Sequence, residues 1–108
     1  MILSPDLSAA LNAVSTGTVT KILLGKGIRN CAMRGPKPLS SDQRVAGSAF
    51  TLRFLPARED LATPEAWARS TRGIEEMPAG VVAVADARGI TEAAILGDIL
   101  AMRMLRGG

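Results

Sequence analysis

The sequence has no histidine, no tyrosine, one cysteine, one tryptophan and two phenylalanines. Without histidine, the Ser-His-Asp and Cys-His catalytic groups are excluded, and the commonest zinc ligand is missing. A single cysteine, Cys31, forms no disulfide within the chain, which favours a reducing compartment. Because Cys31 has apolar neighbours and no histidine to activate it, we expect a packing residue rather than a nucleophile.

Long hydrophobic runs are also missing. No segment approaches the ~20 apolar residues that a membrane helix needs. The first six residues lack the basic region and the long apolar region of a secretory signal. We therefore expect a cytoplasmic protein with no membrane partner.

The composition is that of an ordinary globular chain, with 47% hydrophobic and 21% charged residues in a length of 108. This length suits a single domain over residues 1–108. The net charge of +3 raises the question of nucleic-acid binding. However, the arginines are spread from Arg29 to Arg106 without a run, and stacking aromatic residues are scarce. We expect no direct nucleic-acid partner.

The first half of the chain predicts two helices and a strand. Apolar residues recur on one face of a helix over residues 6–14. A second helix is expected to be capped by Thr16 and to end at residues 25–27, where two glycines flank a lysine. Prolines exclude a helix from residues 34–38. Residues 45–55 alternate and are rich in strand formers, which predicts a strand.

The second half predicts helices alternating with strands. Thr63 followed by Pro64 is a helix start, with a second start considered at Ser70. Residues 81–85 are continuously apolar, as in a parallel strand covered on both faces, and residues 93–96 suggest another short strand. A last helix is expected from Gly97 to Arg106. The alternation predicts an α/β protein with mixed or parallel pairing.

The most informative chemistry lies at Gly97-Asp98-Ile99-Leu100. A helix leaves its first amide groups unpaired and carries partial positive charge there, so these amides attract a carboxylate or phosphate. Gly97 allows a ligand to approach the backbone closely, and Asp98 can cap the helix or hold a hard cation. The plainer alternative is that Asp98 only caps the helix and Gly97 only makes a turn.

Asp86 is a second candidate, because it follows the apolar strand where α/β proteins commonly bind ligands. The alternative, which we favour, is a loop residue that accepts hydrogen bonds from nearby amides.

In the order of its segments, the chain resembles the N-terminal portion of an RraA-like protein (regulator of ribonuclease activity A). That family also contains class II pyruvate aldolases such as 4-hydroxy-4-methyl-2-oxoglutarate aldolase. The resemblance covers most of the chain and is carried by six pieces, each weak alone and fairly specific as an ordered set. They are Ser15-Thr16, residues 29–35 (RNCAMRG), 45–53 (VAGSAFTLR), 56–60 (PARED), 78–82 (PAGVV) and 97–100 (GDIL).

The resemblance implies an α/β fold of the swivelling type, a layered β/β/α sandwich that is usually a trimer or a hexamer of trimers. It implies a lyase dependent on Mg²⁺ or Mn²⁺ that cleaves a 4-hydroxy-2-oxo acid to pyruvate or decarboxylates oxaloacetate. The pyruvyl part of the substrate would be bound by Gly97, Asp98, Ile99 and Leu100. Asp98 would be the catalytic residue and would hold the metal indirectly, through water.

The sequence departs from the family at one point. RraA-like proteins continue past this helix into a strand and an Arg-Asp pair that grips substrate and metal. No Arg-Asp pair occurs in these 108 residues. We therefore expect a shortened product or a fragment, truncated before its C-terminal strands, with half of a site and inactive alone. Its main metal ligand is expected beyond Gly108.

An alternative function within the same family is a regulator that binds and inhibits ribonuclease E. Asp98, retained in the Gly-Asp-x-Leu frame, favours the enzyme, because a purely protein-binding regulator does not need it.

Overall fold

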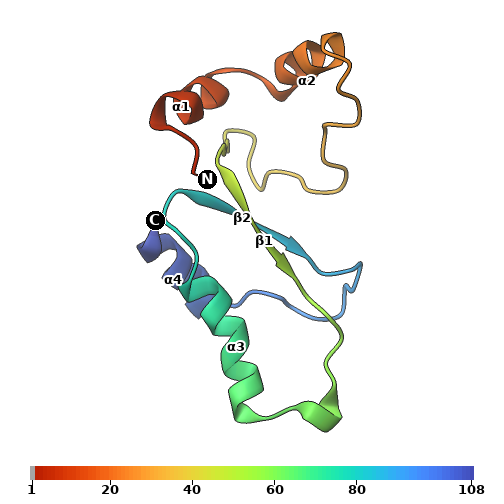
Figure 1. The fold of residues 1–108 in the computed structure, drawn as a ribbon, viewed down its shortest axis with the longest axis vertical. Helices are drawn as coiled ribbons and strands as arrows, with labels where there is room; N and C mark the ends of the chain where they lie inside the picture. Colours follow the sequence, from red (N-terminus) through yellow and green to blue (C-terminus); the bar gives the residue numbers. More distant parts are fainter. Residues whose placement is uncertain (1) are drawn as a thin grey trace. The chain divides into compact units, whose positions relative to one another are not determined.

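The computed structural model describes residues 2–108, except for the side chains of residues 67, 69 and 70. It divides into two compact units, Leu3–Gly47 and Ser48–Gly108, which are described separately below. Figure 1 labels the four α-helices and the two strands of these units. In chain order the elements are α1 (Pro5–Ala13), α2 (Thr16–Gly25), β1 (Ser48–Arg53), the short 3₁₀ helix η1 (Glu59–Leu61), α3 (Pro64–Glu75), β2 (Val81–Asp86) and α4 (Asp98–Gly107).

Helix α1 begins one residue earlier than the predicted 6–14, because Ser4 caps it and Pro5 occupies its first turn. The Ser4 hydroxyl accepts a hydrogen bond from the amide of Leu7 (3.3 Å). At the other end of the helix, the Arg44 guanidinium donates to the carbonyls of Asn12 and Val14 (3.1 Å each). A cation at this end also complements the helix dipole, so Arg44 fastens the later loop onto α1.

Helix α2 is capped by Ser15, whose hydroxyl accepts from the amide of Thr18 (3.1 Å). The prediction of Thr16 as the cap is therefore wrong by one residue. Ser15 has the extended backbone that a capping residue needs, whereas Thr16 is already helical.

The predicted stop of α2 at residues 25–27 is confirmed. The amide of Ile28 donates to the carbonyl of Leu23 (2.9 Å), and that of Gly27 donates to the carbonyl of Leu24 (2.9 Å). Gly27 has a φ of 79°, which a glycine adopts without steric cost. Together these features form a Schellman motif, the usual glycine-dependent helix ending.

Residues 28–47 contain no helix or strand, in keeping with the prolines at 36 and 38. Cys31 lies in this segment and is exposed. The expectation that Cys31 is a packing residue is therefore wrong, because irregular backbone does not turn its apolar sequence neighbours into packing neighbours.

Among residues 2–108, no single helix is long and apolar enough to cross a membrane. Helices α1 and α2 reach that length and composition only as a pair, and the chain bends by 104° between them.

The second unit is built on a parallel pair of strands. β1 and β2 pair in register from Ser48 opposite Val81 to Arg53 opposite Asp86. The connection between them contains η1 and α3, as a parallel crossover requires. This confirms the α/β class, and of the mixed or parallel pairing that was predicted the structure shows a parallel pair. β1 is shorter than the predicted 45–55, and the carbonyl of Ala46 instead accepts a hydrogen bond from Ser8 (3.1 Å).

Helix α3 begins as predicted, since Thr63 caps it through a hydrogen bond from the amide of Ala66 (3.2 Å). It continues unbroken to Glu75, so no new helix starts at Ser70. A Cβ added at Gly73 would lie 3.5 Å from Leu52, which shows that α3 packs closely on one face of the sheet.

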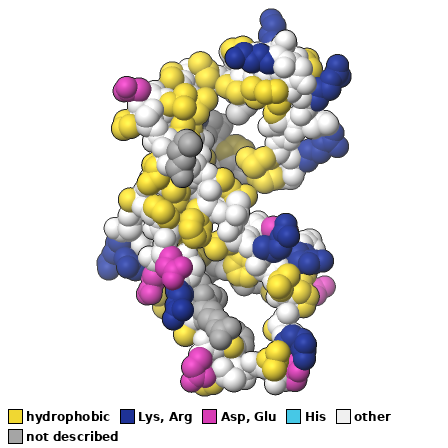
Figure 2. Space-filling view, in the orientation of Figure 1, with side chains coloured by type: hydrophobic (Ala, Val, Ile, Leu, Met, Phe, Trp, Pro, Cys, Tyr) yellow, Lys and Arg dark blue, Asp and Glu magenta, His cyan; other side chains and the backbone are white. Residues whose placement is uncertain are grey.

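The core of the second unit is small. Within the described part of the chain, Ile74 of α3 is the one buried hydrophobic residue, at 9% exposure. Figure 2 shows many apolar side chains open to solvent. Residues 81–83 of β2 are half-buried and residues 84–86 are exposed, so β2 is not covered on both faces as predicted. Within this unit, a single helix layer packs on one face of the two-stranded sheet.

Residues 93–96 form no strand, contrary to the prediction, and belong to the loop that joins β2 to α4. Their apolar run has no neighbouring strand edge to pair with in the described structure. The last helix is confirmed, with α4 starting at Asp98 directly after Gly97.

Candidate substrate site at the start of helix α4

The predicted site lies at the first turn of α4. Gly97 is the capping residue, with extended backbone angles (φ −98°, ψ 171°). The first helical hydrogen bond runs from the amide of Ala101 to the carbonyl of Gly97 (3.0 Å). The amides of residues 98–100 are therefore not used by the helix, as expected for such a terminus.

The Asp98 carboxylate accepts a hydrogen bond from one of these amides. Its Oδ1 accepts a hydrogen bond from the amide of Ile99 at 2.8 Å. Neither its second oxygen nor the amide of Leu100 has a partner among residues 2–108. Asp98 thus takes part in capping, as the plainer alternative proposes, and still leaves an amide and a carboxylate oxygen without a hydrogen-bond partner in the described part of the chain.

Gly97 stands in open space. A Cβ added there would meet no atom within 4 Å, and its φ is one that any residue adopts. Neither backbone strain nor packing in this chain explains a glycine at this position. What a side chain would change is the room in front of the free amides.

Asp86 has a local structural role. Its Oδ1 accepts from the amide of Arg88 (2.9 Å), and its Oδ2 lies 3.3 Å from Nε of Arg53. Arg88 adopts a φ of 56°, a turn conformation that such a hydrogen bond supports. The favoured alternative, a loop residue that accepts from nearby amides, describes Asp86 well. The ion pair with Arg53 was not anticipated, because it depends on the register of β1 against β2, which places Arg53 opposite Asp86.

The segment 56–60 carries a further charge pair next to η1. Nε of Arg58 donates to Oδ1 of Asp60 (2.7 Å), and a second bond joins Nη2 to Oδ2. This forked pairing with the guanidinium lowers the pKa of the Asp60 carboxyl below its ordinary value. Both side chains are exposed, so the pair organises the loop more than it stabilises the fold.

The described residues contain no group of three or more His, Cys, Asp or Glu able to hold a metal. Asp98 offers one carboxylate at the site. Mg²⁺ commonly retains several waters and is bound through one or two carboxylates together with substrate oxygens. The free carboxylate oxygen of Asp98 therefore fits an indirect role toward such an ion, not a complete metal cage.

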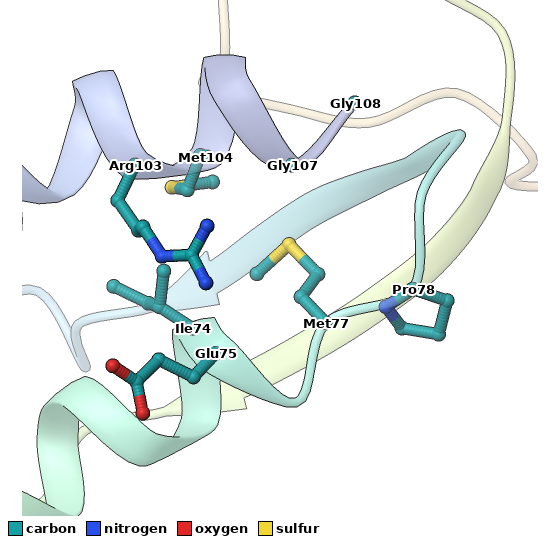
Figure 3. Close-up of a pocket in the computed structure, with 8 residues that line it drawn as sticks. All are labelled: Ile74, Glu75, Met77, Pro78, Arg103, Met104, Gly107 and Gly108. Carbon is teal, nitrogen blue, oxygen red and sulfur yellow. The ribbon is translucent and has the colours of Figure 1, made fainter.

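A small cavity of about 50 Å³ lies between the C-terminal parts of α3 and α4. Figure 3 shows Arg103 reaching from α4 toward Ile74 and Glu75 on α3. The other residues that line the cavity are Met77, Pro78, Met104, Gly107 and Gly108. The cavity has room for little more than water and lies at the opposite end of α4 from Asp98, so it is separate from the candidate site.

Compared with known families, residues 6–108 match the RraA-like family, described as aldolase/RraA. The chain belongs to the RraA-like family. This confirms the resemblance, and the matched range includes residues 97–100. The mixed α/β arrangement with its two-stranded parallel sheet is consistent with part of an RraA-like fold. No curated protein and no solved structure matches the chain significantly.

Proposed function

We propose that the complete RraA-like protein is a divalent-metal-dependent lyase. It would cleave a 4-hydroxy-2-oxo acid to pyruvate or decarboxylate oxaloacetate, with residues 97–100 holding the pyruvyl part. The observation that carries this proposal is the first turn of α4. Neither packing nor backbone conformation requires a glycine at position 97, and the amide of Leu100 in the same turn has no hydrogen-bond partner among the described residues.

In this proposal, each residue of the turn has a different part in binding the substrate. The free amide of Leu100 donates to the substrate carboxylate, and the partial positive charge of the helix start favours the same group. Gly97 leaves the space that the ligand occupies. The amide of Ile99 donates to the Asp98 carboxylate at 2.8 Å, so it donates to the substrate only when that carboxylate turns away.

Asp98 is the described residue suited to hold Mg²⁺ or Mn²⁺, through water. When bound, such an ion supplies Lewis-acid stabilisation of the pyruvate enolate. The Arg-Asp pair implied by the family resemblance does not occur in these 108 residues. We therefore propose that they carry half of the site and are inactive alone.

The deciding experiment measures pyruvate release from oxaloacetate, with Mg²⁺, by the protein expressed from its complete reading frame. Asp98→Asn retains an oxygen that accepts from the amide of Ile99 but removes the charge. We expect Asp98→Asn to melt at nearly the wild-type temperature and to lose most of the turnover. Asp98→Ala should lose turnover as well and also about 0.5–1.5 kcal/mol of stability, because the hydrogen bond from the amide of Ile99 is lost.

Two outcomes would count against the proposal. If Asp98→Ala lowers the melting temperature while both variants keep full turnover, Asp98 is only a cap. If the wild-type protein releases no pyruvate with any divalent metal but binds ribonuclease E, the regulatory alternative holds.

A further inference from the structure

The charged side chains are divided unevenly between the two units of the chain. Residues 3–47 carry six cations and two acids, a net charge of +4, whereas residues 48–108 carry seven cations and eight acids. No acid lies between Asp6 and Asp42. The expectation of no nucleic-acid partner considered the arginines over the whole chain. Counted by unit and with the lysines, the positive charge is concentrated in the first unit.

Five of these cations follow one another at short intervals from α2 into the irregular chain after it. This basic segment, residues 21–37, contains Lys21, Lys26, Arg29, Arg34 and Lys37. All five residues are exposed, and none of their side chains forms an ion pair or a hydrogen bond with a described residue. Unpaired cations are almost never buried, so this charge stays at the surface however the two units pack. Figure 2 shows Lys and Arg side chains gathered over α2 and the chain that follows it.

The irregular part of the basic segment belongs to a loop that is fastened at both ends inside the first unit. The loop begins at the ending of α2, where the amide of Ile28 donates to the carbonyl of Leu23 (2.9 Å). It returns to α1 through the guanidinium of Arg44, which donates to two carbonyls at the end of that helix. The first unit therefore holds the base of this loop by its own contacts.

The loop also contains free backbone donors. None of the backbone amides of residues 29–38 donates a hydrogen bond to a described residue. Amides bind phosphate oxygens in nucleic-acid complexes, beside lysine and arginine. The same amides count against insertion into a lipid bilayer, because irregular backbone with unpaired polar groups does not enter hydrocarbon. Residues 3–47 include no aromatic residue, so this unit has no side chain on which an unpaired base would stack.

We propose that the basic segment binds the phosphate backbone of a double-stranded nucleic acid, without regard to base sequence. A duplex carries one negative charge per about 1.7 Å of its axis, so several phosphates face a segment of this size. The five cations are three to five residues apart, and the free amides lie among them. Without aromatic residues the segment contacts phosphates and does not read bases. The proposal is independent of the lyase site, because it uses none of residues 97–100.

The test is fluorescence anisotropy of a labelled DNA duplex titrated with the 108-residue chain. Five phosphate contacts predict that raising the salt from about 50 mM to about 150 mM weakens binding roughly 100-fold. Two duplexes of unrelated sequence should bind equally well. The double variant Arg29→Gln/Arg34→Gln removes two of the five cations. It should bind at least about tenfold more weakly, with a salt dependence shallower by about two contacts.

Arg88→Gln/Arg106→Gln is the matched control, because it removes the same charge from two exposed arginines of the second unit. It should bind the duplex nearly as tightly as the wild type, and circular dichroism checks that both variants keep their helices. Equal weakening by the two double variants would show that net charge alone attracts the duplex, which overturns the proposal. So does a wild-type chain that binds no duplex at low salt. Polyglutamate that displaces the labelled duplex as well as unlabelled duplex does would indicate an acidic protein partner instead. Binding only to vesicles of equimolar phosphatidylserine and phosphatidylcholine would indicate a lipid surface, and either result refutes the nucleic-acid assignment.

Discussion

Replacing Gly97 by serine separates folding from ligand binding at the start of α4. The position is extended, and an added Cβ meets no atom within 4 Å, so serine fits without strain. A serine hydroxyl at the capping position accepts from one of the first free amides. The amide of Ile99 already bonds to Asp98, so the hydroxyl is expected to take the amide of Leu100.

The two consequences of Gly97→Ser have opposite signs. Serine is the better cap by a few tenths of a kcal/mol, which raises the melting temperature by roughly 1–2 °C. The ligand loses a hydrogen bond to its carboxylate, worth about 1.5–3 kcal/mol, and the space in front of the amide is filled. The dissociation constant for pyruvate should therefore rise by roughly 10- to 150-fold.

The assay is a pyruvate titration of the ¹⁵N-labelled chain, followed at the amide resonances of Ile99 and Leu100, with thermal melting measured in parallel. Gly107→Ser is the control, because it makes the same change in open space at the far end of the same helix. It should leave pyruvate affinity unchanged. If Gly97→Ser raises the melting temperature but binds pyruvate as tightly as wild type, Gly97 only makes a turn and the site proposal fails.

Three further outcomes are expected. Ser15→Ala should cost about 1 kcal/mol in urea unfolding and Thr16→Ala much less, and equal costs would contradict the observed cap. The pKa of Glu65 is lowered by its backbone hydrogen bond and by the Thr63 hydroxyl, so Thr63→Val should raise it toward 4.5 in a carboxyl NMR titration. Because folding lowers this pKa, Glu65 contributes stability at a pH above its pKa in the unfolded chain, and this stability is lost as the pH falls through its pKa in the folded chain. If the pKa of Glu65 is unchanged in Thr63→Val, the hydroxyl does not contribute to the shift. The 108-residue chain should not accelerate oxaloacetate decarboxylation beyond free Mg²⁺, and any metal-dependent turnover by it would contradict the half-site.

Local chemistry in the sequence was enough to place most helix ends. The Thr63-Pro64 start, the stop at residues 25–27 and the start of α4 directly after Gly97 were all predictable, because capping depends on residues within one turn. The parallel pairing followed from the apolar run at 81–85, and the family followed from the order of short motifs. Errors arose where an apolar run alone was used, as at residues 93–96, which have no strand edge to pair with.

Only the tertiary structure decided which groups meet across the chain and which stay open. The register of β1 against β2 brings Arg53 to Asp86, and the crossover places α3 over Leu52 on one face of the sheet. Neither the register of the strands nor the position of α3 follows from the local sequence pattern, because pairing between distant segments depends on how the chain between them packs. In the same way, Gly-Asp-x-Leu in the sequence predicts a helix start. That the Leu100 amide stays free beside an open Gly97 is a property of the folded turn.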